Sequence, residues 1–230
     1  MAATVVSAGT PGKRDGGTGN VTVASFTSAN DDFLLALIHT EFTGTADSIT
    51  SHDGGSSWIQ IGTEVTLGGR SASIWGCFST GATSTAVAAS STSGGMCMSI
   101  EVITGADVSG TVANALKKTD SNTENTSSPS LDLTGATSPT IHLWGLDQAS
   151  VSSQSSGSTL LDDRSFRYGA MRNNVEWDSS ADTAPNISIS ATVNTRNWGV
   201  EIKEAGGGGA TNPKGPFTHP LYGTFRGPIS

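Results

Sequence analysis

The stretch Met-Cys-Met-Ser-Ile-Glu-Val-Ile, residues 96–103, decides the fold class because its side chains alternate in character. Its even-numbered side chains are all apolar, whereas its odd-numbered ones include Cys97, Ser99 and Glu101. Successive side chains of a β-strand point to opposite faces, so a period of two indicates a strand with one face buried. The stretch therefore predicts a strand of a sheet that covers a core.

The same period recurs along the whole chain, between clusters of Gly, Asn, Asp, Ser and Pro that favour turns. Strands are expected at Thr4–Ser7, Val21–Phe26, Phe33–Glu41, Ser57–Thr66, Ser71–Ser79, Met96–Ile103, Ser130–Leu133, Thr140–Leu146, Phe166–Met171, Ile187–Val193 and Asn197–Ile202. Val112–Lys118 predicts a loop or a single turn, and the polar Thr119–Ser130 predicts an exposed loop. Many short strands separated by turns predict an all-β, antiparallel, jelly-roll-like β-sandwich.

The two halves of the chain show a faint likeness, which is too weak to establish a repeat but would suit a jelly roll. The order Phe33–Glu41, Trp58–Ile61, Ser71–Phe78 is followed later by Thr140–Leu146, Phe166–Met171, Trp198–Ile202.

Composition and charge exclude several classes of protein. Charged residues make up only 14% of the chain, and hydrophobic residues make up 35%. All 20 acidic residues but only ten of the 12 basic ones lie at or before Glu204, so the body carries −10 and the remainder +2. Nucleic-acid binding needs Lys and Arg to displace phosphate counterions, so an acidic body argues against it and against binding anionic membranes.

The sequence predicts neither a membrane span nor a secretory signal. The longest apolar run, Phe33–Ile38, is far too short to cross a bilayer. Residues 1–19 contain no apolar segment of the kind that signal peptides carry. We therefore expect synthesis in the cytoplasm.

A boundary is expected at four consecutive glycines, residues 206–209, which separates a sandwich domain (1–205) from a C-terminal arm (206–230). Four of the eight prolines lie in this arm, and proline removes ladder donors, so the arm should be extended. It also carries more large apolar side chains than a solvated tail. Partner binding is therefore expected at Pro213, Pro216, Phe217, His219, Pro220, Leu221, Tyr222, Phe225 and Arg226. An arm folded back over its own sandwich is the alternative.

No catalytic, metal-binding or cofactor-binding motif is found. The four histidines lie in no nucleophile motif, and Gly-x-Ser-x-Gly does not occur. Asp31-Asp32 and Asp162-Asp163 could bind Ca²⁺ or act as paired acids, but no Asp-x-Asp-x-Asp-Gly loop is present and turns favour Asp. We therefore expect turns at both pairs.

Most of the tryptophans and both cysteines are expected to have structural roles. Trp58, Trp75, Trp144 and Trp198 lie among apolar strand residues and should pack in the core. Trp177 has polar neighbours, so it is the best candidate for an exposed contact. Cys77 and Cys97 are expected to be buried thiols rather than a disulfide.

The order of the strand motifs is similar to that of a group of phage and prophage virion proteins, over about residues 20–205. The matching segments are Asn30–Ile38, Gly54–Gly62, Ser71–Phe78 and Met98–Asp107. Asn-Asp-Asp-Phe stands here where that group typically has Gly-Asp-Leu-Leu. The Pro-Phe-Thr-His-Pro-Leu-Tyr-Gly-Thr-Phe-Arg-Gly-Pro arm resembles C-terminal segments of phage structural proteins. The resemblance implies a particle component without enzymatic activity.

The leading hypothesis is a capsid decoration, or cement, protein that docks by its arm onto other virion proteins, such as the major capsid protein, and onto copies of itself. A tail or fibre component that contacts the host is one alternative. A carbohydrate-binding module is another, because the chain has five tryptophans and a polar composition. A hydrolase is disfavoured by the missing motifs.

Overall fold

The structure, a computed structural model, describes residues 2–7, 11–17, 19–41, 48–52, 57–81, 83–89 and 94–206. Every strand pair in this part of the chain is antiparallel, and its helical content is one 3-10 turn, η1 (Val112–Ala115). The all-β prediction is confirmed, and so is the single turn expected near Val112.

The first half of the body contains two sheets. Its strands are β1 (Thr4–Ser7), β2 (Gly12–Arg14), β3 (Val21–Thr27), β4 (Phe33–Thr40), β5 (Ser48–His52), β6 (Ile59–Leu67), β7 (Arg70–Phe78), β8 (Thr83–Ala89) and β9 (Met96–Thr104). The large sheet has the order β1-β9-β4-β7-β6, and β2 also pairs with β9, beyond the end of β1. The small sheet has the order β3-β8-β5.

The second half repeats this arrangement. Its strands are β10 (Leu116–Thr126), β11 (Thr140–Asp147), β12 (Val151–Ser153), β13 (Thr159–Phe166), β14 (Met171–Asp178), β15 (Ser188–Ile189) and β16 (Val193–Ile202). The large sheet has the order β10-β16-β11-β14-β13, and β12 pairs with β15 in a small one. A bridge between Ser130 and Asn186 stands in the place of the pairing of β3 with β8.

Each half has the strand order of a jelly roll, in which the chain passes back and forth between a large and a small sheet. The predicted jelly-roll-like sandwich is thus confirmed, and it occurs twice. Phe33–Glu41 and Thr140–Leu146 do occupy equivalent strands, β4 and β11. The counterpart of Ser71–Phe78 is β14, however, and not Trp198–Ile202.

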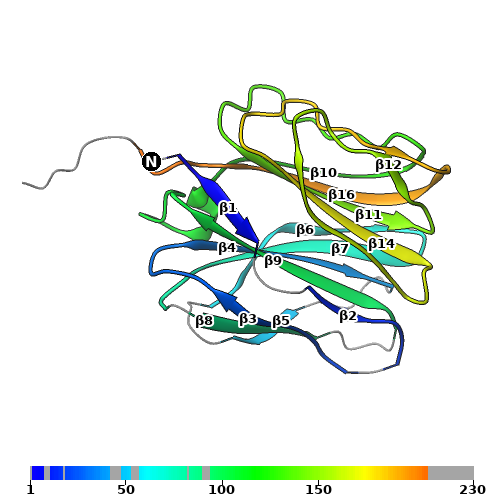
Figure 1. The fold of residues 1–230 in the computed structure, drawn as a ribbon, viewed down its shortest axis with the longest axis horizontal. Coiled ribbons are helices and arrows are strands. Elements are labelled where there is room, and N and C mark those ends of the chain that lie inside the picture. Colours follow the sequence, from blue (N-terminus) through cyan, green and yellow to red (C-terminus); the bar gives the residue numbers. More distant parts are fainter. Residues whose placement is uncertain are drawn as a thin grey trace, which may run out of the picture.

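The sheets form four layers, with the two large sheets in the middle and a small sheet outside each of them (Figure 1). The large sheets face each other across a central core shared by both halves. The first half contributes Phe33, Leu35, Leu37 and Ile74, and the second half contributes Ile141, Leu143, Val175, Trp198 and Val200. A second core lies between the large and small sheets of the first half, and a smaller one lies in the second half.

Five local predictions are wrong. Ser130–Leu133 is not a strand, because only Ser130 forms an isolated bridge, and Ile187–Val193 contains only the two-residue β15 and the first residue of β16. Thr119–Ser130 is not a loop, because its first part belongs to the edge strand β10, which pairs along its length with β16. Phe166–Met171 is the turn between β13 and β14, where Arg167 and Tyr168 have positive φ values of 56° and 52°. Asp162-Asp163 lies within β13, whereas Asp31-Asp32 forms the expected turn, with the Asp32 carboxylate accepting from Ala29 N at 2.6 Å.

Candidate functional site

The residues predicted to bind partners lie outside the described residues. They are Pro213, Pro216, Phe217, His219, Pro220, Leu221, Tyr222, Phe225 and Arg226. The structure does show where the segment that carries them leaves the body, because the described chain ends at Gly206.

The point where the arm leaves the body is fixed beside the N-terminal strand. Ala3 N donates to Glu204 Oε1 at 3.1 Å, and Ala205 N donates to the Gly105 carbonyl at 2.8 Å. Glu204 also forms a bridge with Ala106 in the link between the two halves. The described chain therefore begins and ends at the same end of the body (Figure 1).

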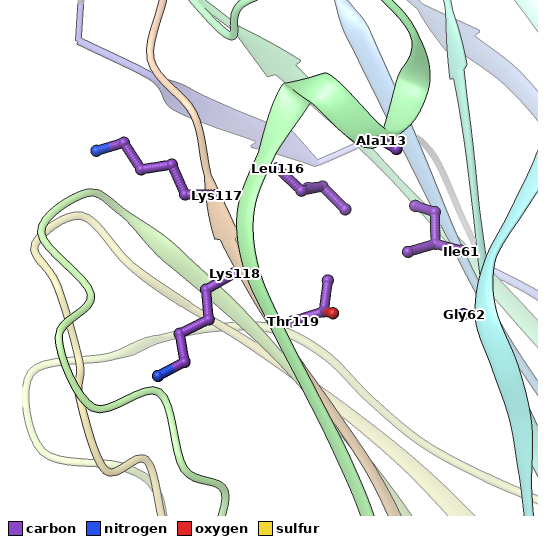
Figure 2. A pocket seen from close by; sticks show the side chains of 7 residues that line it. All are labelled: Ile61, Gly62, Ala113, Leu116, Lys117, Lys118 and Thr119. Atoms are coloured by element: carbon purple, nitrogen blue, oxygen red, sulfur yellow. The ribbon is translucent and has the colours of Figure 1, made fainter.

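A cleft of about 280 Å³ opens between the edge strands β6 and β10, next to η1 (Figure 2). It is lined by Ile61, Gly62, Ala113, Leu116, Lys117, Lys118 and Thr119. The side chain of Leu116 points across the cleft toward Ile61. Leu116 also pairs with Ile202, four residues before the end of the described chain, so the cleft lies close to the root of the arm.

The two lysines of this cleft do not supply free charge to it. Their ammonium groups point away from Ile61 (Figure 2). Lys117 Nζ donates to Ser138 Oγ and lies 3.5 Å from Glu201 Oε1, and Lys118 Nζ donates to the Thr134 carbonyl. The space between β6 and β10 is therefore lined mainly by apolar groups, with the Thr119 hydroxyl beside them, and it suits an aliphatic or aromatic side chain rather than acid–base chemistry.

Strand β6 extends this apolar surface along the edge of the first large sheet. It pairs with β7 only, and Ile59 is 52% exposed, one of three large apolar side chains with such exposure among the described residues. An edge strand with exposed apolar side chains is a site where another extended segment can pair.

Buried ion pairs join the two halves at one end of the central core. The fully buried Arg196 guanidinium of β16 donates to Asp147 Oδ1 at 2.8 Å and to the Leu67 carbonyl at 2.9 Å. Arg70 of β7 lies 2.6 Å from the same carboxylate. Since every group of this cluster has a protein partner, we interpret it as a structural clamp.

Two carboxylates between the halves have perturbed pKa values but no access to a substrate. Burial, and secondarily the charge of Asp162, raises the pKa of Glu101 to about 8, and burial raises that of Asp162. Glu101 is 2% exposed and Asp162 is 7% exposed. Paired acids of a glycosidase must face each other across a cleft, so these buried groups do not form such a site.

The histidines do not form a triad in the described part of the chain. His39 is buried with its ring edge-on to Phe166, at 5.2 Å between centroids. Burial, helped by the charges of Arg196 and Arg70, holds its pKa well below the ordinary value. His142 is also buried, which lowers its pKa to about 4, and Nε2 lies 3.0 Å from Thr140 Oγ1. The side chains of His52 and His219 lie outside the described residues.

The prediction of an exposed contact at Trp177 is wrong. The residue is 7% exposed and packs in the central core from β14. Its polar sequence neighbours Asn174 and Glu176 face the other side of the sheet, so they do not report on its own exposure. Trp144 and Trp198 are buried as predicted.

The two cysteines are buried and are not joined by a disulfide, as predicted. They pack in different clusters on different faces of the first large sheet. Burial raises the pKa of Cys77 to about 12, so this thiol is a poor nucleophile.

Within the described ranges, no group of three or more His, Cys, Asp and Glu side chains could hold a metal ion. The one described helical segment is a single turn, so no helix there could span a membrane. No family model, no curated protein and no solved structure matches this chain.

Proposed function

We propose that this chain is a non-enzymatic structural protein of a phage particle, most simply a capsid decoration protein that docks through residues 206–230. Its partners would be other virion proteins, with the major capsid protein first among them, and further copies of itself. It would be made in the host cytoplasm and reside in the virion. Neither nucleic acid nor a membrane is needed for this role.

The fixed root of the arm is the observation that supports this proposal most. Hydrogen bonds at Glu204 and Ala205 fix the chain to the body directly before Gly206, the first glycine of the run and the last described residue. Beyond that root the sequence changes from an acidic body to a basic segment rich in proline and large apolar residues. An extended segment with several apolar anchors can contact several neighbours at once, which gives avidity without a large rigid interface.

The body supports a scaffold role because several of its ionisable groups with shifted pKa values are enclosed. His39, Glu101 and Glu176 are each at most 2% exposed, so they cannot meet a substrate in this conformation. Enclosed titratable groups together with an arm suit attachment better than turnover.

Particle composition tests the proposal directly. Purified particles should contain the chain at a fixed copy number relative to the capsid protein, measured by quantitative mass spectrometry. Its absence from particles that are otherwise complete would refute the proposal.

Deletion of residues 206–230 tests the arm separately. The truncated chain should keep the thermal unfolding midpoint of the full chain, because the described cores lie before Gly206. It should fail to bind particles that lack the protein. A truncated chain that restores full occupancy would exclude the arm as the docking element.

A host-contacting tail or fibre protein, or a carbohydrate-binding module, is the second candidate function. It is favoured by a polar cleft beside β12, β13 and β14, lined by Ser, Gln, Asp and Asn side chains. A glycan array separates the two candidates, since a protein that serves only to reinforce a capsid should bind no glycan.

A further inference from the structure

The cleft between β6 and β10 lies at an open edge of the central core. These two strands are edge strands of the first and the second large sheet. Ile61 belongs to the central core and Leu116 packs against it, and both side chains line the cleft (Figure 2). An apolar side chain that entered the cleft would therefore extend this core and remove apolar surface of both halves from water.

Strand β6 continues the apolar surface beyond the cleft. Ile59 pairs with Gly76, and residues directly opposite each other on neighbouring strands share a face of the sheet. A Cβ added to Gly76 would lie 2.6 Å from Val112 Cγ1 of η1, so Ile59, which is 52% exposed, is on the side of the sheet where η1 and the cleft lie. A segment that follows β6 would contact Ile59 and the cleft together.

The arm begins close enough to this cleft to reach it. Leu116, which lines the cleft, pairs with Ile202, and the chain from Ile202 to Gly206 spans at most about 14 Å. The first large apolar residue after the glycine run is Phe217, and the chain from Gly206 to Phe217 spans at most about 40 Å. The side chain of Phe217 can therefore enter the cleft of its own body with length to spare for a turn.

Tethering favours this chain's own arm over a separate occupant of the cleft. A short flexible linker gives an effective concentration on the order of 1 mM, which is about a thousandfold above that of a second copy in a micromolar solution. Residues 206–209 are all glycine, so the linker can reverse its direction. Charge acts in the same sense, since the residues after Glu204 carry +2 and the body carries −10.

We propose that in the free chain the arm folds back and Phe217 occupies the cleft between β6 and β10, so that a partner of the arm must displace it. The contact is weak, because the cleft takes one large side chain, and the separate segment should bind with a dissociation constant of about 1 mM. This value is close to the effective concentration, so the arm is bound for roughly half to four fifths of the time. Such a balance adds little to the stability of the fold. The displacement by a partner rests on the function proposed above, whereas the contact within the chain does not.

Paramagnetic broadening in the full chain tests the contact. Thr218→Cys places a nitroxide label beside Phe217, and both native thiols are buried and should not take the label. The methyl signals of Ile61 and Leu116 should be broader with the oxidised label than with the reduced one, whereas those of Ile189, in the core of the second half, should not change. Tenfold dilution should leave the broadening unchanged, because the contact lies within one chain.

Two pairs of variants assign the contact to its residues. Phe217→Ser should remove most of the broadening, whereas the same change at Phe225 should leave it in place. Ala113→Glu puts a charged side chain at an exposed position that lines the cleft, so it should act like Phe217→Ser. Gln60→Glu adds the same charge at an exposed position of β6 outside the cleft lining, and it should change nothing.

Three results of this experiment would overturn the inference. They are no broadening at Ile61 and Leu116, equal broadening in Phe217→Ser and Phe225→Ser, and broadening that falls on dilution, which would assign the cleft to the arm of a second copy.

The displacement by a partner is tested with particles that lack the protein. Ala113→Glu should reach half occupancy at an about two- to fivefold lower concentration than wild type, because its arm is always free. Equal or weaker binding of this variant would contradict the displacement. The NMR experiment uses the purified chain, so its failure would leave the particle composition test unaffected, and absence of the chain from particles would leave the NMR result unaffected.

Discussion

Replacing Glu101 by Gln should stabilise the protein at neutral and alkaline pH and leave it unchanged in acid. The carboxyl lies on β9 between the two large sheets, and burial, together with Asp162, raises its pKa from 4.5 to about 8. Between these two values the folded chain binds a proton that the unfolded chain has released. Stability from this group is therefore present in acid and is lost as the pH rises toward 8.

The size of the effect follows from the shift. Each pKa unit corresponds to about 1.4 kcal/mol, so full ionisation of Glu101 costs the folded state about 5 kcal/mol. Integrating the linkage relation gives a loss of about 2.5 kcal/mol between pH 5 and pH 7. For a chain of this size, that corresponds to about 5–10 °C in the unfolding midpoint. Gln has the same shape without the titration, so the variant should lack this loss.

The assay is urea unfolding of wild type and Glu101→Gln at pH 5, 6, 7 and 8, in which the difference between the two chains cancels the contributions of all other groups. Glu64→Gln, on the outer strand β6, is the control and should change the pH dependence less. Parallel curves for wild type and Glu101→Gln from pH 5 to pH 8 would refute the assignment of a raised pKa to this carboxyl.

Three further changes test the packing. Asp147→Asn leaves the buried Arg196 guanidinium without its charge partner and should cost about 3–5 kcal/mol in urea unfolding; an unchanged midpoint would contradict the clamp. Gly62→Ala should cost about 1–3 kcal/mol, because φ is +66° and the new Cβ would lie 2.7 Å from an indole carbon. Gly69→Ala, with φ +78° and no atom within 4 Å, isolates the backbone part, so an equal loss in both would exclude the clash. The buried thiol of Cys97, whose pKa is raised by burial, should react with a disulfide reagent only when the chain unfolds, and rapid labelling of the native protein would contradict its burial.

The fold class could be predicted from sequence because the central strands alternate clearly. Met96–Ile103 lies within β9, and Thr4–Ser7 coincides with β1. Strand β10 was missed because it has no apolar residue after Leu116. Its half-buried face is filled by polar side chains, so it shows no hydrophobic period. Pairing with β16 makes it a strand, and that pairing is not visible locally.

The duplication was hidden by a change of side-chain character between equivalent strands. Where β4 places Leu34 and Ala36 toward its small sheet, β11 places His142 and Trp144, so hydrophobic patterns of the two halves do not superimpose. The polar neighbours of Trp177 led to a wrong prediction because they face the other side of the sheet. The cleft between β6 and β10 could not be predicted, because it brings together strands from distant parts of the chain.

The shared central core has a consequence during synthesis. The first half leaves the ribosome with Phe33, Leu35 and Ile74 on a sheet face that only the second half covers. At a translation rate of about 5–20 residues per second, the remaining strands take roughly 5–20 s to appear. For that interval the nascent chain exposes an apolar sheet surface that a chaperone, or the same face of another nascent chain, could occupy. Yield of the native protein should therefore depend on how quickly the second jelly roll is translated.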